Sequence, residues 1–531
     1  MRAGARDRPP ARDRAAEEGA SVRREMTAFD VRDILKSAAA QPGEAGSRAA
    51  MPPAENLVPP RKGGPLSLVV LTGCVRAAEF GLVAATGIAA QLAVLHGLVP
   101  LHLGYLAAIF GLAALNLAVQ QVAGSYGIRA FRAFFQFGLR VALGWSLVFL
   151  LAATVLFFAK LGDQYSRLWL GAYYLAGLVL LLGGRLALSI AVSDQMRQGR
   201  FDRRTAIVGG GEPAEALIKA LEWQPDSGVK IVGVFDDRSD GRSSDVVAGY
   251  PKLGTVSDLV AYARNTRLDL IIFTLPISAE ARILQMLSKL WVLPIDIRLS
   301  AHASKLRLRP RSYSYLGSVP VLDLFDKPIA DWDVVVKAMF DRTVGGLMLV
   351  AFAPIMLAVA LAVKLTSKGP VLFRQKRYGF NNELIEVYKF RSMYVDQSDA
   401  GAARLVTRGD PRVTPVGRFI RKTSLDELPQ LFNVLKGDLS LVGPRPHALQ
   451  AKAANTLYDQ VVDGYFARHK VKPGLTGWAQ INGWRGETDT SEKIQRRVEH
   501  DLYYIENWSV FFDLQILAMT PFALLKTENA Y

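Results

Sequence analysis

The sequence predicts an α-helical membrane protein with a four-helix transmembrane unit, a soluble Rossmann-like α/β domain and an α-rich C-terminal domain that contains a re-entrant membrane helix. Three observations support this fold class. Hydrophobic residues make up 50% of the 531 residues, and the apolar stretches concentrate before residue 195. Strand-like and helix-like runs alternate between residues 204 and 325, as in a doubly wound sheet. A further apolar segment, interrupted by Pro354, precedes a stretch rich in arginine.

Residues 1–62 are predicted to form a disordered basic tail, because they are rich in Arg, Ala, Pro and Gly and poor in large apolar groups. The first 30 residues lack an apolar core, which argues against a secretory signal peptide. The net charge of +16 suits an anionic membrane surface. Nucleic acid is not an expected partner, because the sequence shows no basic stripe with stacking aromatic residues. The single cysteine, Cys74, excludes an intrachain disulfide and a Cys-based zinc site.

The next segment, residues 63–196, is predicted to form the transmembrane unit. Each of its four apolar stretches supplies roughly the 20 residues that a spanning helix needs. The stretches lie at about 66–95, 101–122, 135–158 and 168–192. Arg76 and Glu79 within the first stretch are spaced for pairing. Basic residues crowd the tail, the loop near Arg129 and the exit after residue 196, which places both ends of the unit in the cytoplasm.

Residues 197–325 are predicted to form the Rossmann-like domain. Strand-like runs at 205–209, 229–235, 269–273 and 291–298 accompany helical runs at 213–223 and 279–290. Residues 209–214 match the G-x-G-x-x-A form of the dinucleotide fingerprint between a strand and a helix. Asp236 or Asp237, after the second strand, is then a candidate for contact with a ribose. A fold without a working cofactor site is an equal alternative, so the cofactor of this domain stays unknown.

Residues 326–531 form the C-terminal domain, which begins with a nearly continuous apolar segment at 344–363. An ordinary membrane span here would carry the arginine-rich region to the far side of the membrane. It would also put five basic residues between 364 and 377 on the side that the positive-inside rule disfavours. Pro354 removes a backbone hydrogen bond near the middle of the segment and bends the helix. We therefore predict a re-entrant helix at about 335–365 that returns to the same leaflet.

An adjacent pair of carboxylates, Asp426 and Glu427, lies in the arginine-rich stretch. The surrounding arginines are Arg408, Arg412, Arg418, Arg421 and Arg445. One carboxylate can attack or accept a proton, the other can hold Mg²⁺, and guanidinium groups can neutralise phosphate oxygens. This pattern predicts phosphate chemistry at a membrane surface, with Arg418, Arg421 and Arg445 as candidate substrate-binding residues.

A structural interpretation of the same residues is compatible with the functional one. Residues 424–427 fit an S-x-x-E capping box at a helix start. Alternatively, the helix begins one turn later with Pro429 at its first position. In either case Gly437 can end the helix.

From residue 337 to the C-terminus, the chain resembles the bacterial sugar transferase family of polyprenyl-phosphate hexose-1-phosphate transferases. The motifs that carry the resemblance are 369–375 with Arg377 and Gly379, 388–393, 424–430, 440–446, 472–480 and 497–508. The four N-terminal stretches and the α/β domain resemble the polytopic branch of the family. His447 and residues 483–490 are most similar to its undecaprenyl-phosphate glucose phosphotransferases. Two positions depart from the family pattern: Ala338 follows Lys337 in place of an arginine, and Ala353 precedes Pro354 in place of a serine.

The resemblance implies that residues 326–531 are the catalytic domain and that the reaction has two steps. Asp426 would attack the β-phosphate of UDP-glucose, which gives an aspartyl-phosphosugar and UMP. Undecaprenyl phosphate would then accept the phosphosugar and become undecaprenyl-diphospho-glucose, the primer of an exopolysaccharide. Such a phosphotransferase would lie in the bacterial inner membrane with its catalytic domain on the cytoplasmic face. A homo-oligomer is allowed but not required by the sequence.

The resemblance also implies roles for individual residues. Glu427 would coordinate the cofactor Mg²⁺, which bridges the phosphates. Phosphate would be bound by Lys389, Arg391 and Arg445, and the donor would also be held by Gln480 and Arg485.

Three alternatives stay open. The same chemistry can use UDP-galactose or a UDP-N-acetylhexosamine. The α/β domain can instead be the reactive part of a membrane-bound NAD-dependent sugar-nucleotide epimerase or dehydratase, but this class needs a Tyr-x-x-x-Lys pair, which is missing between residues 205 and 330. The third alternative is a membrane sensor or transporter, in which the spans carry the function.

Overall fold

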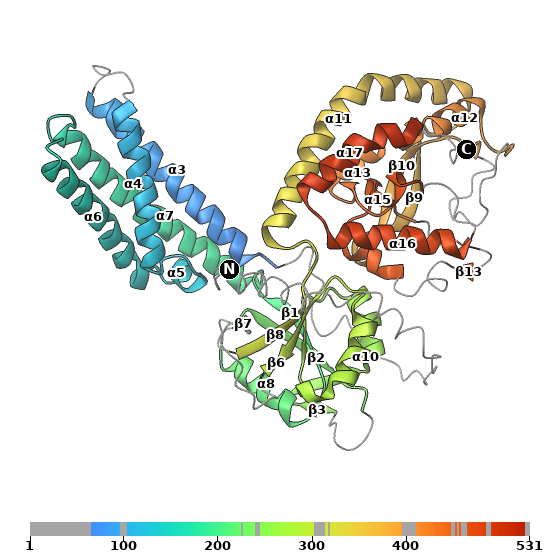
Figure 1. The fold of residues 1–531 in the computed structure, drawn as a ribbon, viewed down its shortest axis with the longest axis horizontal. Coiled ribbons are helices and arrows are strands. Elements are labelled where there is room, and N and C mark those ends of the chain that lie inside the picture. Colours follow the sequence, from blue (N-terminus) through green and yellow to red (C-terminus); the bar gives the residue numbers. More distant parts are fainter. Residues whose placement is uncertain are drawn as a thin grey trace, which may run out of the picture. The chain divides into compact units, whose positions relative to one another are not determined.

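The computed structural model describes residues 65–95, 103–224, 227–238, 245–301, 314–316, 319–395, 410–447, 452–453, 456–457, 465–484 and 490–525 (Figure 1). The chain divides into two compact units, a helical unit at 61–203 with 228–230, and a unit that contains the remaining residues. Among the described residues, five helices are long and apolar enough to cross a membrane by length and composition. Four belong to the helical unit, and the fifth is α11 (Asp331–Thr366).

The helical unit contains the long helices α3 (Leu68–Leu95), α4 (Leu103–Val122), α6 (Phe134–Phe158) and α7 (Arg167–Arg197), with the short α5 (Ile128–Arg132) between α4 and α6. Aromatic residues fill its core: Trp145 and Tyr173 are fully buried, and their rings lie 5.8 Å apart. The ion-pair partner of Glu79 is Arg185 on α7, at 2.5 Å, rather than the expected neighbour Arg76. A buried charge takes the partner that tertiary packing brings to it, so sequence spacing alone does not decide the pair.

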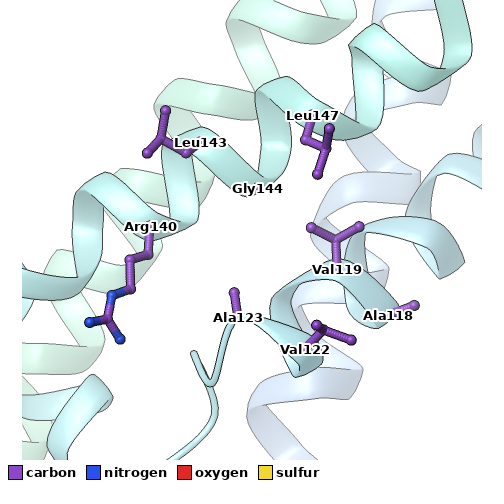
Figure 2. A pocket seen from close by; sticks show the side chains of 8 residues that line it. All are labelled: Ala118, Val119, Val122, Ala123, Arg140, Leu143, Gly144 and Leu147. Atoms are coloured by element: carbon purple, nitrogen blue, oxygen red, sulfur yellow. The ribbon is translucent and has the colours of Figure 1, made fainter.

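An open groove lies between α4 and α6 (Figure 2). Its lining consists of Ala118, Val119, Val122, Ala123, Arg140, Leu143, Gly144 and Leu147. Seven of these residues are aliphatic or glycine, and the lining offers neither a carboxylate nor a nucleophile. The groove therefore lacks the groups that phosphate transfer requires.

The α/β domain consists of β1 (Arg203–Val208), α8 (Glu212–Glu222), β2 (Val229–Phe235), β3 (Val246–Val247), β4 (Tyr250–Gly254), α9 (Val256–Asn265), β5 (Leu270–Phe273), η2 (Ile277–Ala279), α10 (Glu280–Leu290), β6 (Asp296–Ser300), β7 (Ser314–Leu316) and β8 (Val319–Phe325). The strand order is β3-β4-β2-β1-β5-β6-β8-β7. The pairs β1–β5, β5–β6 and β2–β4 are parallel. The pairs β3–β4, β6–β8 and β7–β8 are antiparallel. The predicted α/β sheet is confirmed. The strand expected at 291–298 begins at Asp296 instead, because α10 and a turn occupy the preceding residues.

The C-terminal domain follows α11 with β9 (Leu372–Tyr378), η5 (Phe380–Asn382), β10 (Leu384–Phe390), α12 (Pro415–Lys422), η7 (Leu425–Glu427), α13 (Gln430–Lys436), β11 (Ser440–Val442), β12 (Lys452–Ala453), β13 (Thr456–Leu457), η8 (Tyr465–Lys470), β14 (Gly474–Thr476), α15 (Trp478–Ile481), α16 (Ser491–Glu506) and α17 (Val510–Leu525). Its strands form short two-stranded sheets. The core gathers apolar side chains from α13, β11, α16 and α17, among them Leu431, Leu441, Ile494 and Ile516.

Helix α11 contains Pro354 and curves over the rest of the C-terminal domain in Figure 1. Near its start, Asp341 accepts hydrogen bonds from the hydroxyl of Ser440, at 3.0 Å, and the main chain of Leu441, at 3.1 Å. Near its end, the carbonyl of Val363 accepts a hydrogen bond from Arg391 at 3.2 Å. Both ends of α11 therefore contact the same folded domain. The opposite face is apolar and exposed, with Leu347, Val350, Leu357, Leu361 and Leu365.

Candidate active site

The adjacent carboxylates lie on η7, a single turn between α12 and α13. Ser424 precedes them with φ of 60°, in the left-handed region, and its side chain does not cap the turn. The predicted capping box is therefore wrong, because a capping residue needs extended backbone. Helix α13 begins at Gln430, one residue after the alternative start that was predicted at Pro429. The helix ends at Lys436, and Gly437 follows with φ of 92°, which confirms the predicted helix end.

Glu427 is held by two cations from distant parts of the chain. Lys389 Nζ donates to Oε1 at 2.8 Å. Arg445 donates to both carboxylate oxygens, from Nη2 to Oε1 at 2.6 Å and from Nη1 to Oε2 at 3.2 Å. Burial alone would raise the pKa of Glu427, but Arg445 and Lys389 outweigh it and hold the pKa well below its usual range. Glu427 is therefore ionised at physiological pH.

The hairpin of β9 and β10 supplies Lys389 and a further cation, Arg377. The two strands are antiparallel, with Lys389 opposite Phe373 and Arg377 opposite Ile385. Burial and the charge of Arg445 lower the pKa of Arg377 to about 10, opposed by the nearby carboxylates. The sequence singles out Arg377 only within a motif, not as a site residue. The two-residue period of the paired strands could have identified Arg377 as a site residue, because it places the side chains of Arg377 and Lys389 on the same face of the hairpin.

Arg445 lies in the turn that follows β11. This strand pairs with β14 in parallel, with Ser440 opposite Gly474. The backbones approach so closely that a Cβ on Gly443 would lie 2.5 Å from the carbonyl oxygen of Lys472. A Cβ on Gly474 would lie 2.1 Å from the Gly443 nitrogen. These glycines are needed for the close approach that brings the turn next to η7.

The other predicted site residues take different places. Arg421, in the last turn of α12, is close enough to oppose the rise in the pKa of Asp426. Arg418, on the same helix, is exposed. The amide nitrogen of Gln480 is buried and has no partner among the described residues. Arg485 lies outside the described residues, as does Arg408.

Arg391 is directed away from the carboxylates, towards the end of α11. Its guanidinium donates to the carbonyl of Pro370 at 2.6 Å and to that of Val363 at 3.2 Å. It also donates to the carbonyl and the hydroxyl of Ser367, both at 2.8 Å. In this structure Arg391 binds the C-terminal end of α11, whereas the family resemblance implied that it binds phosphate. The difference arises because helix ends leave carbonyls that attract cations.

Asp426 is buried and differs from its neighbour in protonation. Burial, opposed by Lys389 and reinforced by the charge of Glu427, raises the pKa of Asp426 to about 6. Glu427 is therefore ionised at neutral pH, whereas Asp426 loses its proton only near pH 6. A pair of titratable groups whose pKa values are pushed apart is typical of catalytic sites.

We expect the kcat/KM of the protein to fall about tenfold for each pH unit below the pKa of Asp426, which is about 6, because only its ionised form is nucleophilic. The folded-state pKa lies above the ordinary value, so protonation begins at a higher pH than for an exposed aspartate. The measurement is kcat/KM between pH 4.5 and 8, because this ratio reports the pKa values of the free enzyme. A ratio that stays constant down to pH 5 would contradict the assignment.

The charge balance indicates what the site can bind. Four cationic groups, Lys389, Arg377, Arg421 and Arg445, act on only two carboxylates. The surplus of positive charge suits the oxygens of a diphosphate. The described residues contain no group of three or more His, Cys, Asp or Glu side chains able to hold a metal. The carboxylate pair fits Mg²⁺ only where substrate phosphates complete the shell, which is the usual arrangement for this ion.

The glycine loop of the α/β domain is occupied by the domain's own side chains. Gly210 donates its N–H to Asp236 at 3.0 Å, and the Thr274 hydroxyl donates to the carbonyl of Gly209 at 3.0 Å. Asp237 accepts the N–H of Val256 at 2.8 Å and thereby contacts the start of α9. The first turn of α8 also carries two glutamates, which would repel a pyrophosphate. One N–H of the loop is therefore already bonded within the domain, and the two glutamates disfavour a pyrophosphate at this helix start.

Comparisons with known proteins cover the C-terminal domain, the α/β domain and part of the helical unit. Residues 332–527 match the model of the family described as bacterial sugar transferase. Residues 121–301 match the model described as a CoA-binding domain. The second match agrees with the α/β fold, while the occupied glycine loop argues against the ligand in its description.

Several curated proteins are similar over most of the chain. A UDP-glucose:undecaprenyl-phosphate glucose-1-phosphate transferase of Xanthomonas campestris pv. campestris is 37% identical over 72% of this chain and 79% of its own length. A protein of the same name from Escherichia coli (strain K12) is 38% identical over 76% and 84%. An undecaprenyl-phosphate glucose phosphotransferase of Komagataeibacter xylinus is 42% identical over 62% and 61%.

Proposed function

This chain belongs to the bacterial sugar transferase family, and on that premise we propose that it transfers glucose 1-phosphate from UDP-glucose to undecaprenyl phosphate. The products are undecaprenyl-diphospho-glucose and UMP, and the reaction primes the synthesis of an exopolysaccharide. The observation that carries this proposal is the buried Asp426–Glu427 pair within a surplus of cations. Relatives that align with about four fifths of their length bear names that state this reaction.

In the first step, a carboxylate oxygen of Asp426 attacks the β-phosphorus of the donor. The bond between the β-phosphorus and the bridging oxygen breaks, and UMP leaves with the electron pair. Burial keeps Asp426 poorly solvated and therefore reactive once it is ionised. Arg421 and Lys389 act on the same carboxylate, so they are placed to neutralise the phosphate oxygens as the charge moves.

In the second step, a phosphate oxygen of undecaprenyl phosphate attacks the phosphorus of the aspartyl-phosphosugar. The bond to the Asp426 carboxylate breaks, and the free carboxylate is restored. One phosphoanhydride is exchanged for another over the two steps, so the reaction needs no ATP. The site's main contribution is position and charge neutralisation.

Glu427 would hold Mg²⁺ together with the phosphates of the donor. When bound, the ion would supply Lewis-acid neutralisation of the diphosphate charge. Both oxygens of Glu427 already accept hydrogen bonds from cations, so the carboxylate is fixed in orientation before the donor enters. The remaining ligands would come from phosphate and water.

The chain is a multi-pass bacterial membrane protein, and the proposal further places its catalytic domain on the cytoplasmic face of the inner membrane. Support comes from α11. A straight helix of its 36 residues would be about 54 Å long, and its residues from Lys337 to Val363 contact one folded domain. We infer that α11 is re-entrant, with its apolar exposed face towards lipid and its other face on the catalytic domain. Such an anchor holds the site at the interface where a soluble donor meets a lipid acceptor.

The experiment that tests the function is UMP release by the purified full-length protein with undecaprenyl phosphate and each of three donors. UDP-glucose is expected to give the highest kcat/KM, followed by UDP-galactose and UDP-N-acetylglucosamine. Preference for one of the other donors would keep the reaction and change the sugar. Absence of UMP release with every donor would reject the proposal.

A further inference from the structure

The turn that carries Arg445 is held by its main-chain carbonyls. Three cationic side chains from three separate elements donate to carbonyl oxygens between residues 442 and 446. They are Lys337 of α11 to Val442 at 3.0 Å, Arg468 of η8 to Arg445 at 2.9 Å, and Arg377 of β9 to Pro446 at 2.6 Å. Hydrogen bonds from charged donors are stronger than those from neutral ones. The turn is therefore fixed from several directions.

Neither Lys337 nor Arg468 has a place in the chemistry, and of the two only Arg468 donates to the main chain of Arg445 itself. The side chain of Arg468 is fully buried and pairs with Asp501 at 2.5 Å. Nη2 makes both this ion pair and the hydrogen bond to the Arg445 carbonyl, while Nη1 lies 2.6 Å from Nδ1 of His447. Burying an ion pair in this way costs solvation free energy that hydrophobic residues would not. The ion pair is therefore weak evidence for stability, while its geometry fixes the guanidinium of Arg468 against the turn.

His447 completes the contact between Arg468 and the turn. Burial, followed by the charges of Arg468 and Arg497, holds the pKa of His447 well below its usual range. The neutral ring can therefore accept a hydrogen bond from Arg468 at all physiological pH values. Arg468 consequently contacts both Arg445 and the second residue after it.

We propose that Arg468 is a positioning residue for the transferase reaction, which holds the main chain of Arg445 so that its guanidinium stays paired with Glu427. This inference rests on the proposed function. Arg468 acts through Arg445, since its own hydrogen bonds go to Asp501, His447, Tyr465 and the Arg445 carbonyl. A substitution of Arg468 should therefore change kcat only when residue 445 is an arginine.

The test is a double-mutant cycle in the full-length protein, with Arg468→Lys, Arg445→Gln and the double variant. A lysine keeps the charge but has a single nitrogen, which cannot reproduce the forked contacts of Arg468. Displacement of a catalytic group by about 1 Å can cost roughly 100-fold, so Arg468→Lys is expected to lower kcat by about 10- to 100-fold with little change in KM. Asp501→Asn provides a second route to the same defect.

In the Arg445→Gln background, adding Arg468→Lys should change kcat by no more than about twofold, because the two residues act as one unit. Arg496→Ala is the matched control: this arginine is exposed on α16 and pairs with Glu499 at 3.3 Å. It should leave kcat unchanged. Equal losses from Arg468→Lys in both backgrounds would overturn the inference. A wild-type protein that releases no UMP would instead reject the proposed function.

Discussion

Replacing Asp426 by asparagine is expected to lower turnover by at least about 1,000-fold, because an amide cannot form the covalent intermediate. The substitution preserves the volume of the side chain. The neighbouring contacts of Glu427 with Lys389 and Arg445 should therefore persist. The measurement is steady-state UMP release with UDP-glucose and undecaprenyl phosphate. Retention of more than a few per cent of wild-type kcat would contradict a nucleophilic role.

The same variant is expected to be more stable than the wild type at neutral pH. The pKa of Asp426 is raised from 3.8 to about 6 in the folded state, so its ionised form opposes folding. Asparagine removes this charge, whose cost at neutral pH is on the order of 3 kcal/mol. The advantage should be largest above pH 6, should decrease as the pH falls, and should vanish only below about 3.8, where Asp426 is protonated in both the folded and the unfolded state. Thermal unfolding at pH 4.5 and 7.5 measures the difference.

Replacing Glu427 by glutamine is expected to lower kcat by about 100- to 1,000-fold, because the site would lose the proposed metal ligand and an electrostatic partner of Lys389 and Arg445. The dependence of the rate on Mg²⁺ concentration should shift to higher concentrations. Glutamate-to-aspartate substitution at the same position is the control, since it keeps the charge and shortens the reach. A Mg²⁺ profile equal to that of the wild type would exclude Glu427 as a ligand.

Stability should respond to Glu427→Gln in the opposite direction from Asp426→Asn. The folded-state pKa of Glu427 is lowered, so its ionised form stabilises the fold at neutral pH and this stabilisation is lost only on strong acidification. Removing the charge leaves Lys389 and Arg445 buried with Asp426 as their only carboxylate partner, which costs on the order of 3 kcal/mol. A gain of stability for Asp426→Asn and a loss for Glu427→Gln would support different roles for the two adjacent carboxylates.

Features that depend on neighbouring residues were predicted well from the sequence. The carboxylate pair, the apolar helices and the alternating α/β segments all depend on local pattern, and the structure contains each of them. Asp426 is buried, and the pKa values of Asp426 and Glu427 are shifted in opposite directions, while the chemistry expected of them stays a prediction. Pattern alone was sufficient here, because period and composition decide which face of an element is buried.

Choices of partner across long sequence distances were not predictable. Arg391 lies near Lys389 in the sequence, yet one binds the end of α11 and the other binds Glu427. Glu79 pairs with Arg185, which is far from it in the chain. The carboxylates of Asp236 and Asp237 accept hydrogen bonds from the main-chain N–H groups of Gly210 and Val256. Each of these contacts depends on tertiary packing, which decides which unsatisfied polar group comes close to the side chain. A local sequence pattern does not contain this information.

The most direct test of the account is a single-turnover experiment without lipid. The full-length protein is incubated with Mg²⁺ and UDP-glucose labelled in the sugar, then digested and analysed by mass spectrometry. We predict one equivalent of UMP per active protein and a phosphoglucose adduct on Asp426, which disappears when undecaprenyl phosphate is added. Release of UMP only after the lipid is added, or an adduct on a different residue, would contradict the two-step mechanism.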